Sequence, residues 1–148
     1  MNIRKATTKD LSRVAEIYVF NNRMNYYPIF KDASFSFDEL QVVSLVDHYF
    51  SQEEILNNIF VYDDGIIRGF IQINGTEICK LYVDTFFQSG GFGKELIEYA
   101  TENYHADYLW ALEKNVRAIS FYQKHGFKLS GDKKFEEGTT EYLVKLIR

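Results

Sequence analysis

The sequence predicts a mixed α/β domain in which helices cover both faces of one sheet. The first observation is the order of the patterns, because strand-like apolar runs and amphipathic helical segments follow one another as β-α-α-β-β-β-α-β-α-β-β. The second is size: 148 residues, of which 46% are apolar, suit one domain spanning residues 1–148. The third is that no linker, repeat or low-complexity segment divides the chain.

The first elements are a short strand and an amphipathic helix. The strand is expected at residues 3–6, and Thr7 or Thr8 can cap a helix whose apolar positions recur at helical spacing. Pro28 is the only proline, and we expect it in a loop after that helix. Residues 29–37 alternate aromatic and polar side chains without a clear period, so they predict no regular element.

Two further helices are predicted before the strands begin. One carries the apolar positions of residues 40–50. A shorter one is expected across residues 51–58, where Ser51 and Glu54 form a capping-box pattern. The strands, helices and turn predicted after them, in chain order, are strand 59–62, turn 63–65, strands 66–73 and 77–83, helix 91–104, strand 108–112, helix 116–124, and strands near 127–130 and 142–147.

Composition excludes several classes of protein. The sequence contains no run of about 18 apolar residues, so it predicts no membrane span. Residues 1–5 lack the apolar stretch of a signal peptide, and the single cysteine, Cys79, allows no intramolecular disulfide. We therefore expect a cytoplasmic protein. The net charge of −4, with no basic stripe, argues against nucleic acid as the main partner.

A glycine-rich turn between a strand and a helix predicts an anion site. The turn follows Leu81, Tyr82 and Val83, and its residues are Gln88, Ser89, Gly90, Gly91, Phe92, Gly93 and Lys94. Backbone N–H groups at a helix start lack intrahelical partners, and glycine lets a ligand approach the main chain closely. The spacing fits neither a Walker loop nor a dinucleotide fingerprint, but it fits Gln-x-x-Gly-x-Gly.

A second motif follows about 25 residues later. Asn115 opens a helical segment that contains Phe121-Tyr122 and ends at Gly126-Phe127, and an apolar strand precedes it. In this order, the two units resemble the GCN5-related N-acetyltransferase (GNAT) family. The resemblance implies a mostly antiparallel twisted sheet with helices on both faces and a splayed central parallel strand pair. It also implies N-acetyltransferase activity that uses acetyl-coenzyme A (acetyl-CoA) and an amine acceptor.

The resemblance assigns the donor-binding residues. The turn from Gln88 to Lys94 would cradle the pyrophosphate, with Gln88 reaching it from the edge and Gly90 adding no side-chain contact. Lys94 either adds charge or points to solvent. The strand residues Leu81, Tyr82 and Val83 would bind the pantetheine arm through their backbone. Asn115 would bind that arm, cap its helix, or do both.

Catalysis needs an acid, oxyanion donors and a neutral amine. Tyr122 matches the family tyrosine that gives a proton to the leaving thiolate, although it can equally pack its helix. A backbone N–H near Val83 would bind the oxyanion. Glu77 matches the general base of the histone-acetylating branch, or it is a solvated residue after a turn. His48, Asp47 and a water chain are the alternatives.

The other reactive side chains are expected to be structural. Cys79 would need a histidine partner and a ping-pong route to act as a nucleophile, whereas the family transfers acetyl groups directly. His105 and His125 have no ligand-like spacing to other residues, so no metal site is predicted.

The acceptor pocket is expected from the first two helices and their loop. That region is rich in aromatic residues and contains four carboxylates that can attract a cationic amine, namely Asp32, Asp38, Glu39 and Asp47. A small amine is the first choice of acceptor, and a protein lysine or N-terminus is the second. A non-catalytic acetyl-CoA sensor is the rival class. The chain is expected to be a monomer or a homodimer.

Overall fold

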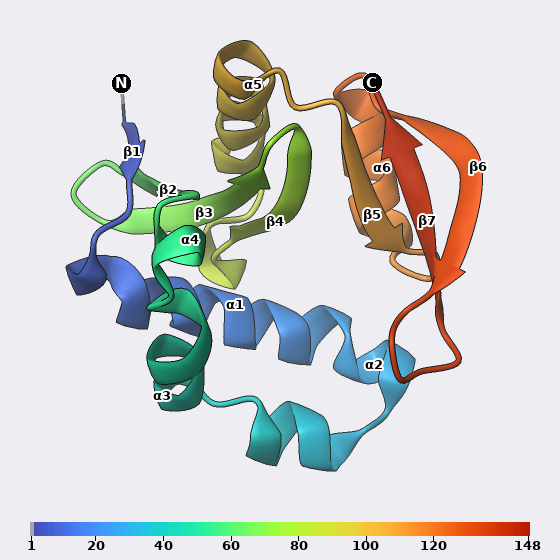
Figure 1. Ribbon diagram of the computed structural model, residues 1–148, viewed down its shortest axis with the longest axis horizontal. Coiled ribbons are helices and arrows are strands. Elements are labelled where there is room, and N and C mark those ends of the chain that lie inside the picture. The colour runs from blue at the N-terminus through green and yellow to red at the C-terminus, as the bar shows by residue number, and fades with distance from the viewer. Residues whose placement is uncertain (1) are drawn as a thin grey trace.

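The computed structural model describes residues 2–148, and its centre is a seven-stranded sheet (Figure 1). The strand order is β1-β2-β3-β4-β5-β7-β6, and every neighbouring pair is antiparallel except β4 and β5. This arrangement confirms the predicted fold class. The strands are β1 (Ile3–Lys5), β2 (Ile59–Asp63), β3 (Ile67–Asn74), β4 (Glu77–Val83), β5 (Tyr108–Leu112), β6 (Lys128–Phe135) and β7 (Tyr142–Ile147).

Apolar side chains leave both faces of the sheet and form two core clusters. In β2, Phe60 and Tyr62 pack into the cluster beneath α5, whereas Ile59 and Val61 pack into the cluster beneath α1. Successive residues of a strand point to opposite faces, so an unbroken apolar run belongs to a strand covered on both sides. Figure 1 shows α1 and α5 on opposite sides of β3 and β4.

The helices differ from the sequence prediction mainly before residue 59. Pro28 lies in the first turn of a short helix, where its missing N–H costs nothing, rather than in a loop. The segment 40–50 divides into α3 and a π-helical turn, Val46–Phe50. Ser51 does not cap the next helix, because its hydroxyl donates to the Asp47 carbonyl. The α-helices are α1 (Leu11–Asn25), α2 (Tyr27–Phe30), α3 (Val42–Leu45), α4 (Glu53–Leu56), α5 (Phe92–Tyr104) and α6 (Val116–Lys124).

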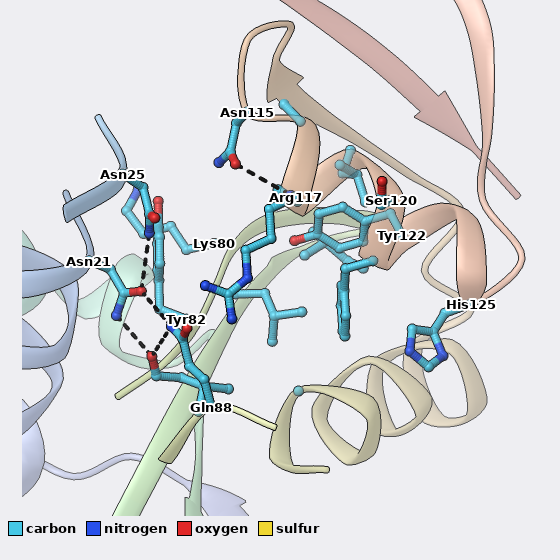
Figure 2. A pocket seen from close by; sticks show the side chains of 18 of the residues that line it. Asn21, Asn25, Lys80, Tyr82, Gln88, Asn115, Arg117, Ser120, Tyr122 and His125 are labelled. Atoms are coloured by element: carbon cyan, nitrogen blue, oxygen red, sulfur yellow. Dashed lines mark hydrogen bonds between the residues drawn. The ribbon is translucent and has the colours of Figure 1, made fainter. Parts of the chain in front are cut away.

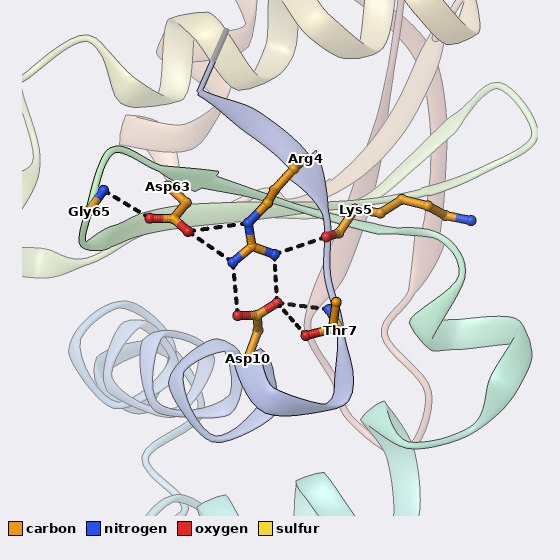
Figure 3. A network of polar contacts seen from close by, with 6 residues as sticks. All are labelled: Arg4, Lys5, Thr7, Asp10, Asp63 and Gly65. Atoms are coloured by element: carbon orange, nitrogen blue, oxygen red, sulfur yellow. Dashed lines mark hydrogen bonds and ion pairs between the residues drawn. The ribbon is translucent and has the colours of Figure 1, made fainter.

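A polar network fixes the start of α1 against the sheet (Figure 3). The Arg4 guanidinium pairs with Asp10 at 2.8 Å and with Asp63 at 2.9 Å. Asp10 also accepts from the Thr7 backbone N–H at 2.8 Å, which closes the capping box at the chain's entry into α1. The network therefore joins β1, the β2–β3 turn and α1, and so sets where α1 crosses the sheet.

The parallel pair in the middle of the sheet is short. β4 pairs with β5 only at Glu77–Tyr108 and Ile78–Leu109. Beyond these residues β5 continues its ladder with β7, while β4 continues its ladder with β3. The two central strands therefore diverge toward the carboxyl end of β4, as the predicted splayed pair requires. Within residues 2–148, no helix has the length and apolar character needed to cross a membrane.

Candidate active site

A cavity of about 690 Å³ opens where β4 and β5 diverge (Figure 2). Its walls come from β4 and β5, from the first turn of α5, from the length of α6, and from the end of α1. Most of the residues predicted from the sequence line this one cavity: Leu81, Tyr82, Val83, Gln88, Ser89, Gly91, Phe92, Gly93, Lys94, Asn115 and Tyr122. Gly90 and Glu77 are not among its lining residues.

The backbone of β4 presents free hydrogen-bonding groups to the cavity. The Asp84 N–H donates to the Arg68 carbonyl at 2.9 Å, which fixes the alternation of the β3–β4 ladder. In that alternation Tyr82 bonds to β3, whereas Leu81 and Val83 turn their N–H groups toward β5, where no ladder continues. A pantetheine arm can therefore meet the main chain of Leu81 and Val83. The backbone of Tyr82 faces the other way, contrary to the prediction, and only its side chain reaches the cavity.

The glycine turn forms the mouth of an anion site. Gly91 is the N-cap of α5 with φ of 84°, and Ser89 also has a positive φ, of 75°. A left-handed backbone is strained for serine and is typical of functional turns. The first intrahelical acceptor in use is the Gly91 carbonyl, which bonds to the Glu95 N–H. The earlier N–H groups of α5 are therefore open to a ligand, and the helix dipole favours an anion there.

Of the side chains of the turn, Gln88 is placed differently from the expectation, whereas the position of Lys94 leaves both of its expected roles open. The Gln88 amide lies 3.4 Å from both the Asn21 Oδ1 atom and the Val83 carbonyl, so it bridges the turn to α1. Sequence reasoning placed it on the phosphates. Lys94 is 61% exposed and lies 3.9 Å from Glu98, although it also borders the cavity. Solvent and cavity are both within reach of its ammonium group.

The helix α6 supplies the opposite wall. The Asn115 Oδ1 atom accepts from the Ala118 N–H at 3.3 Å, so Asn115 is the N-cap of α6. This cap uses only the oxygen, and the side-chain N–H₂ group stays available to a ligand. Tyr122 is 8% exposed, and burial, with a smaller effect from Tyr26, raises its pKa far above the ordinary value. Its phenol is therefore a protonated donor at neutral pH.

The expected general bases lie outside the cavity lining. Glu77 stands at the start of β4, beside Tyr108, before the point at which the strands diverge. Asp47 and His48 are exposed on the π-helical turn after α3. Among the described residues, 2–148, no aspartate or glutamate lines the cavity. The structure thus brings the acid candidate to the cavity but not the predicted base.

The acidic acceptor pocket expected from the sequence does not form around this cavity. Asp32, Asp38, Glu39 and Asp47 are all exposed, and none lines it. The charged lining is instead cationic and consists of Lys80, Lys94, Arg117 and Lys124. A carboxylate can attract a ligand only if the fold directs its side chain into the binding site. In the short helical segments before residue 59, these four carboxylates point to solvent instead.

Sequence reasoning expected the first helix at the acceptor pocket but did not single out its asparagines as part of the cavity. Asn21, Asn25 and Tyr26 line it, and Figure 2 shows the two asparagines across the cavity from Tyr122. The Tyr26 hydroxyl lies 2.8 Å from the Tyr82 hydroxyl, which joins α1 to β4. No local pattern marks these positions, because they meet β4 only through the tertiary crossing. Arg117 also lines the cavity, and sequence reasoning could have found it because it lies two residues after Asn115 in the second motif.

The cysteine and the histidines show no reactive arrangement. Burial, with a smaller effect from Glu77, raises the pKa of the Cys79 thiol, which disfavours the thiolate. Burial lowers the pKa of His125, whose ring packs against Phe121 with 4.7 Å between centroids. Within residues 2–148, no three side chains of the metal-ligating types gather into a group that could hold an ion.

A model of the Acetyltransferase (GNAT) domain matches residues 56–129, which is half of the chain. The chain belongs to the GNAT family. The match spans both motifs and the diverging strands between them, so it confirms the resemblance. Family membership brings N-acetyltransferase activity with acetyl-CoA as co-substrate.

Individual relatives of this GNAT chain have different acceptors. It is 24% identical over 145 residues to the spermine/spermidine N(1)-acetyltransferase of Bacillus subtilis, covering 91% of this chain and 92% of the relative. It is 30% identical over 90 residues to the peptidyl-lysine N-acetyltransferase YjaB of Salmonella typhimurium, covering 60% and 62%. The PaiA N-acetyltransferase of Thermoplasma acidophilum, solved with coenzyme A, shares the fold with a TM-score of 0.65 and 22% identity, covering 97% of this chain and 96% of that one.

Proposed function

We propose that this protein transfers the acetyl group of acetyl-CoA directly to the primary amine of a small molecule. The observation that carries the proposal is the meeting of the Gly91 turn, the free β4 backbone and the Tyr122 phenol at one cavity. Each of the three answers one demand of the reaction: binding of phosphate, alignment of the pantetheine arm and stabilisation of the leaving thiolate.

Donor binding follows from charge and main-chain geometry. The pyrophosphate would sit on the N–H groups at the start of α5, with Lys94, Arg117 and Lys124 balancing its charge. The pantetheine amides would pair with the Leu81 backbone, and the Asn115 amide would donate to the same arm. The Val83 carbonyl already accepts from the Asn21 side chain at 2.9 Å, which leaves the Val83 N–H for the reacting group. This assignment places the thioester deep in the cleft between β4 and β5.

The chemistry is one acyl transfer. The amine nitrogen attacks the thioester carbonyl, the carbon–sulfur bond breaks, coenzyme A leaves as a thiol, and the amine loses one proton. The Val83 N–H faces the cleft and would bind the oxyanion. The Tyr122 phenol would give its proton to the sulfur as negative charge develops there and would regain one from solvent, which takes up the proton that the amine loses. Its raised pKa keeps that proton available throughout the neutral range.

The amine proton has two possible routes. With no carboxylate in the cavity lining, solvent in the cavity can carry the proton away. Alternatively, a bridging water connects the amine to Glu77. The substitution Glu77→Gln separates these routes: a base role predicts a lower kcat that recovers as rising pH deprotonates the free amine, and a solvent route predicts an unchanged profile.

The test of the proposed function is turnover across an amine panel with wild type and Tyr122→Phe. General acid catalysis is typically worth about 100-fold or more, so we expect kcat to fall by roughly that factor while the Kd for coenzyme A stays the same. Tyr104→Phe is the matched control, because Tyr104 lies at the end of α5 and does not line the cavity. An unchanged kcat in Tyr122→Phe would remove the acid role.

The amine panel also distinguishes two alternative functions. The similarity to a peptidyl-lysine N-acetyltransferase favours a lysine or N-terminal amine of a protein as the second acceptor class. Turnover of peptides, but not of small amines, would support it. Binding of acetyl-CoA without turnover of any amine or peptide would instead support a sensor module.

A further inference from the structure

Lys80 is a half-buried cation that the donor does not need. It lies in β4 three residues before Val83, about 10 Å away along the strand, and the glycine turn begins farther on. Phosphates held at that turn are therefore beyond its contact. Lys94, Arg117 and Lys124 already supply positive charge at the α5 and α6 end of the same cavity.

The surroundings of Lys80 contain no negative charge. Its Nζ donates to the Tyr49 hydroxyl at 3.2 Å and lies 5.4 Å from the ring centre of Tyr18. No aspartate or glutamate within residues 2–148 forms an ion pair with it, and none lines the cavity. Burial lowers the pKa of Lys80, but Tyr18 and Tyr49 outweigh that effect and raise it overall. The ammonium group of Lys80 thus has tyrosine side chains, and no carboxylate, as its neighbours.

A partly buried ammonium ion without a counter-ion loses part of its solvation, which the Tyr49 hydroxyl and the rings of Tyr18 and Tyr49 restore only in part, so an anionic ligand would be stabilised beside it. Lys80 has three N–H donors, and the Tyr49 hydroxyl takes one of them. Two donors remain for a ligand. Tyr82, next on the same face of β4, contacts Tyr18 edge to face and hydrogen-bonds Tyr26, so this face belongs to the α1 side of the cavity.

We propose that Lys80 selects an acceptor that carries a carboxylate beside its primary amine, as an amino acid does. The inference rests on the proposed acetyl transfer. The two free N–H donors would hold the two carboxylate oxygens, and the amine would then point along β4 toward the thioester at Leu81 and Val83. A polyamine brings further positive charge to a lining without carboxylates, so it would be a poor substrate.

The experiment compares matched acceptors that differ only in that group, namely each amino acid, its carboxamide and its decarboxylated amine. Each rate is calculated per concentration of the unprotonated amine, so that differences in amine pKa do not enter. We expect wild type to favour the carboxylates at least tenfold in kcat/KM, and spermidine to be poorer still. Lys80→Met should abolish the preference by raising KM for the carboxylates alone, and Lys80→Arg should retain part of it. Lys145→Met is the control, because Lys145 also lies against an aromatic ring, that of Tyr108, but outside the cavity lining.

Equal use of the paired acceptors by wild type, or a preference that survives in Lys80→Met, would overturn the assignment. If no amine is acetylated at all, the proposed function fails by itself. Calorimetry then still decides the role of Lys80, with the coenzyme A complex titrated with N-acetyl amino acids and with the matching N-acetyl amines. Tighter binding of the acids that is lost in Lys80→Met would support it, and equal or absent binding would refute it.

Discussion

The donor and acceptor sides of the cavity are built in different ways. On the donor side, α5 has 13 residues and α6 has nine, and the ligand would meet main-chain groups held by a glycine turn. On the acceptor side, α2, α3 and α4 have four residues each, and recognition would fall to side chains such as Lys80 and Tyr26. A main-chain site depends on local spacing, whereas a side-chain site depends on how distant segments cross. A main-chain donor site can therefore keep its structure when side chains on the acceptor side are replaced and the acceptor specificity changes.

The largest effect is expected where the acceptor side is anchored. Phe50 is fully buried and meets the rings of Tyr18, Tyr49 and Phe70 edge to face. Phe50→Ala should lower the free energy of unfolding by about 3–5 kcal/mol, because it leaves a cavity between the π-helical turn and the sheet. Chemical denaturation measures this loss. Phe86→Ala, at a side chain 90% exposed, should change stability by less than about 0.5 kcal/mol. A similar loss in both would show that Phe50 is not the anchor.

The second prediction concerns the attachment of α1. Asp10→Asn removes a charge that pairs with Arg4, and hydrogen bonds to charged groups contribute about 1.5–3 kcal/mol. The hydrogen bonds from Arg4 hold the pKa of Asp10 below its usual range. Its stabilisation is therefore complete above the unfolded pKa of about 3.9 and is lost as the pH falls through the folded pKa.

Unfolding free energies of wild type and Asp10→Asn should therefore differ at pH 7 and converge in acid, below the folded pKa. Lys9→Met provides a control, because Lys9 is exposed beside the network and takes no part in it. A difference between wild type and Asp10→Asn that did not depend on pH would contradict the ion pair as its source.

The third prediction tests whether main-chain groups bind the donor, coenzyme A. Alanine at position 91 would have to adopt a left-handed backbone at a cost of about 1–2 kcal/mol, and relaxation of that strain moves the N–H groups at the start of α5. We expect Gly91→Ala to weaken binding of coenzyme A by about tenfold, for every acceptor alike. Gly138→Ala carries a similar strain, at φ of 75°, on the β6–β7 turn outside the cavity lining. Loss of affinity in both variants would mean that general strain, and not the turn, is responsible.

The same contrast explains what could be predicted from the sequence. The two motifs follow from local patterns, the diverging strands follow from the family resemblance that those motifs carry, and Gly91 and Asn115 lie at helix starts as their types demand. The acceptor side did not follow, because the four carboxylates suggest an acidic pocket for a cationic amine in the sequence, whereas the fold turns them toward solvent. Lys80 had no visible partner in the sequence, since Tyr18 and Tyr49 reach it from other elements.

The smallest effect separates the two uses of Asn115. Asn115→Ala removes the cap of α6 and should cost about 1 kcal/mol in unfolding free energy, together with any affinity that the amide gives to the pantetheine arm. Asn115→Ser keeps a cap acceptor but has no amide N–H₂ group, so it should restore most of the stability. If the amide also binds the donor, Asn115→Ser still binds coenzyme A several-fold more weakly than wild type in calorimetry. If the affinity for coenzyme A recovers together with the stability, Asn115 acts only as a helix cap. Main-chain groups then account for an even larger part of donor binding.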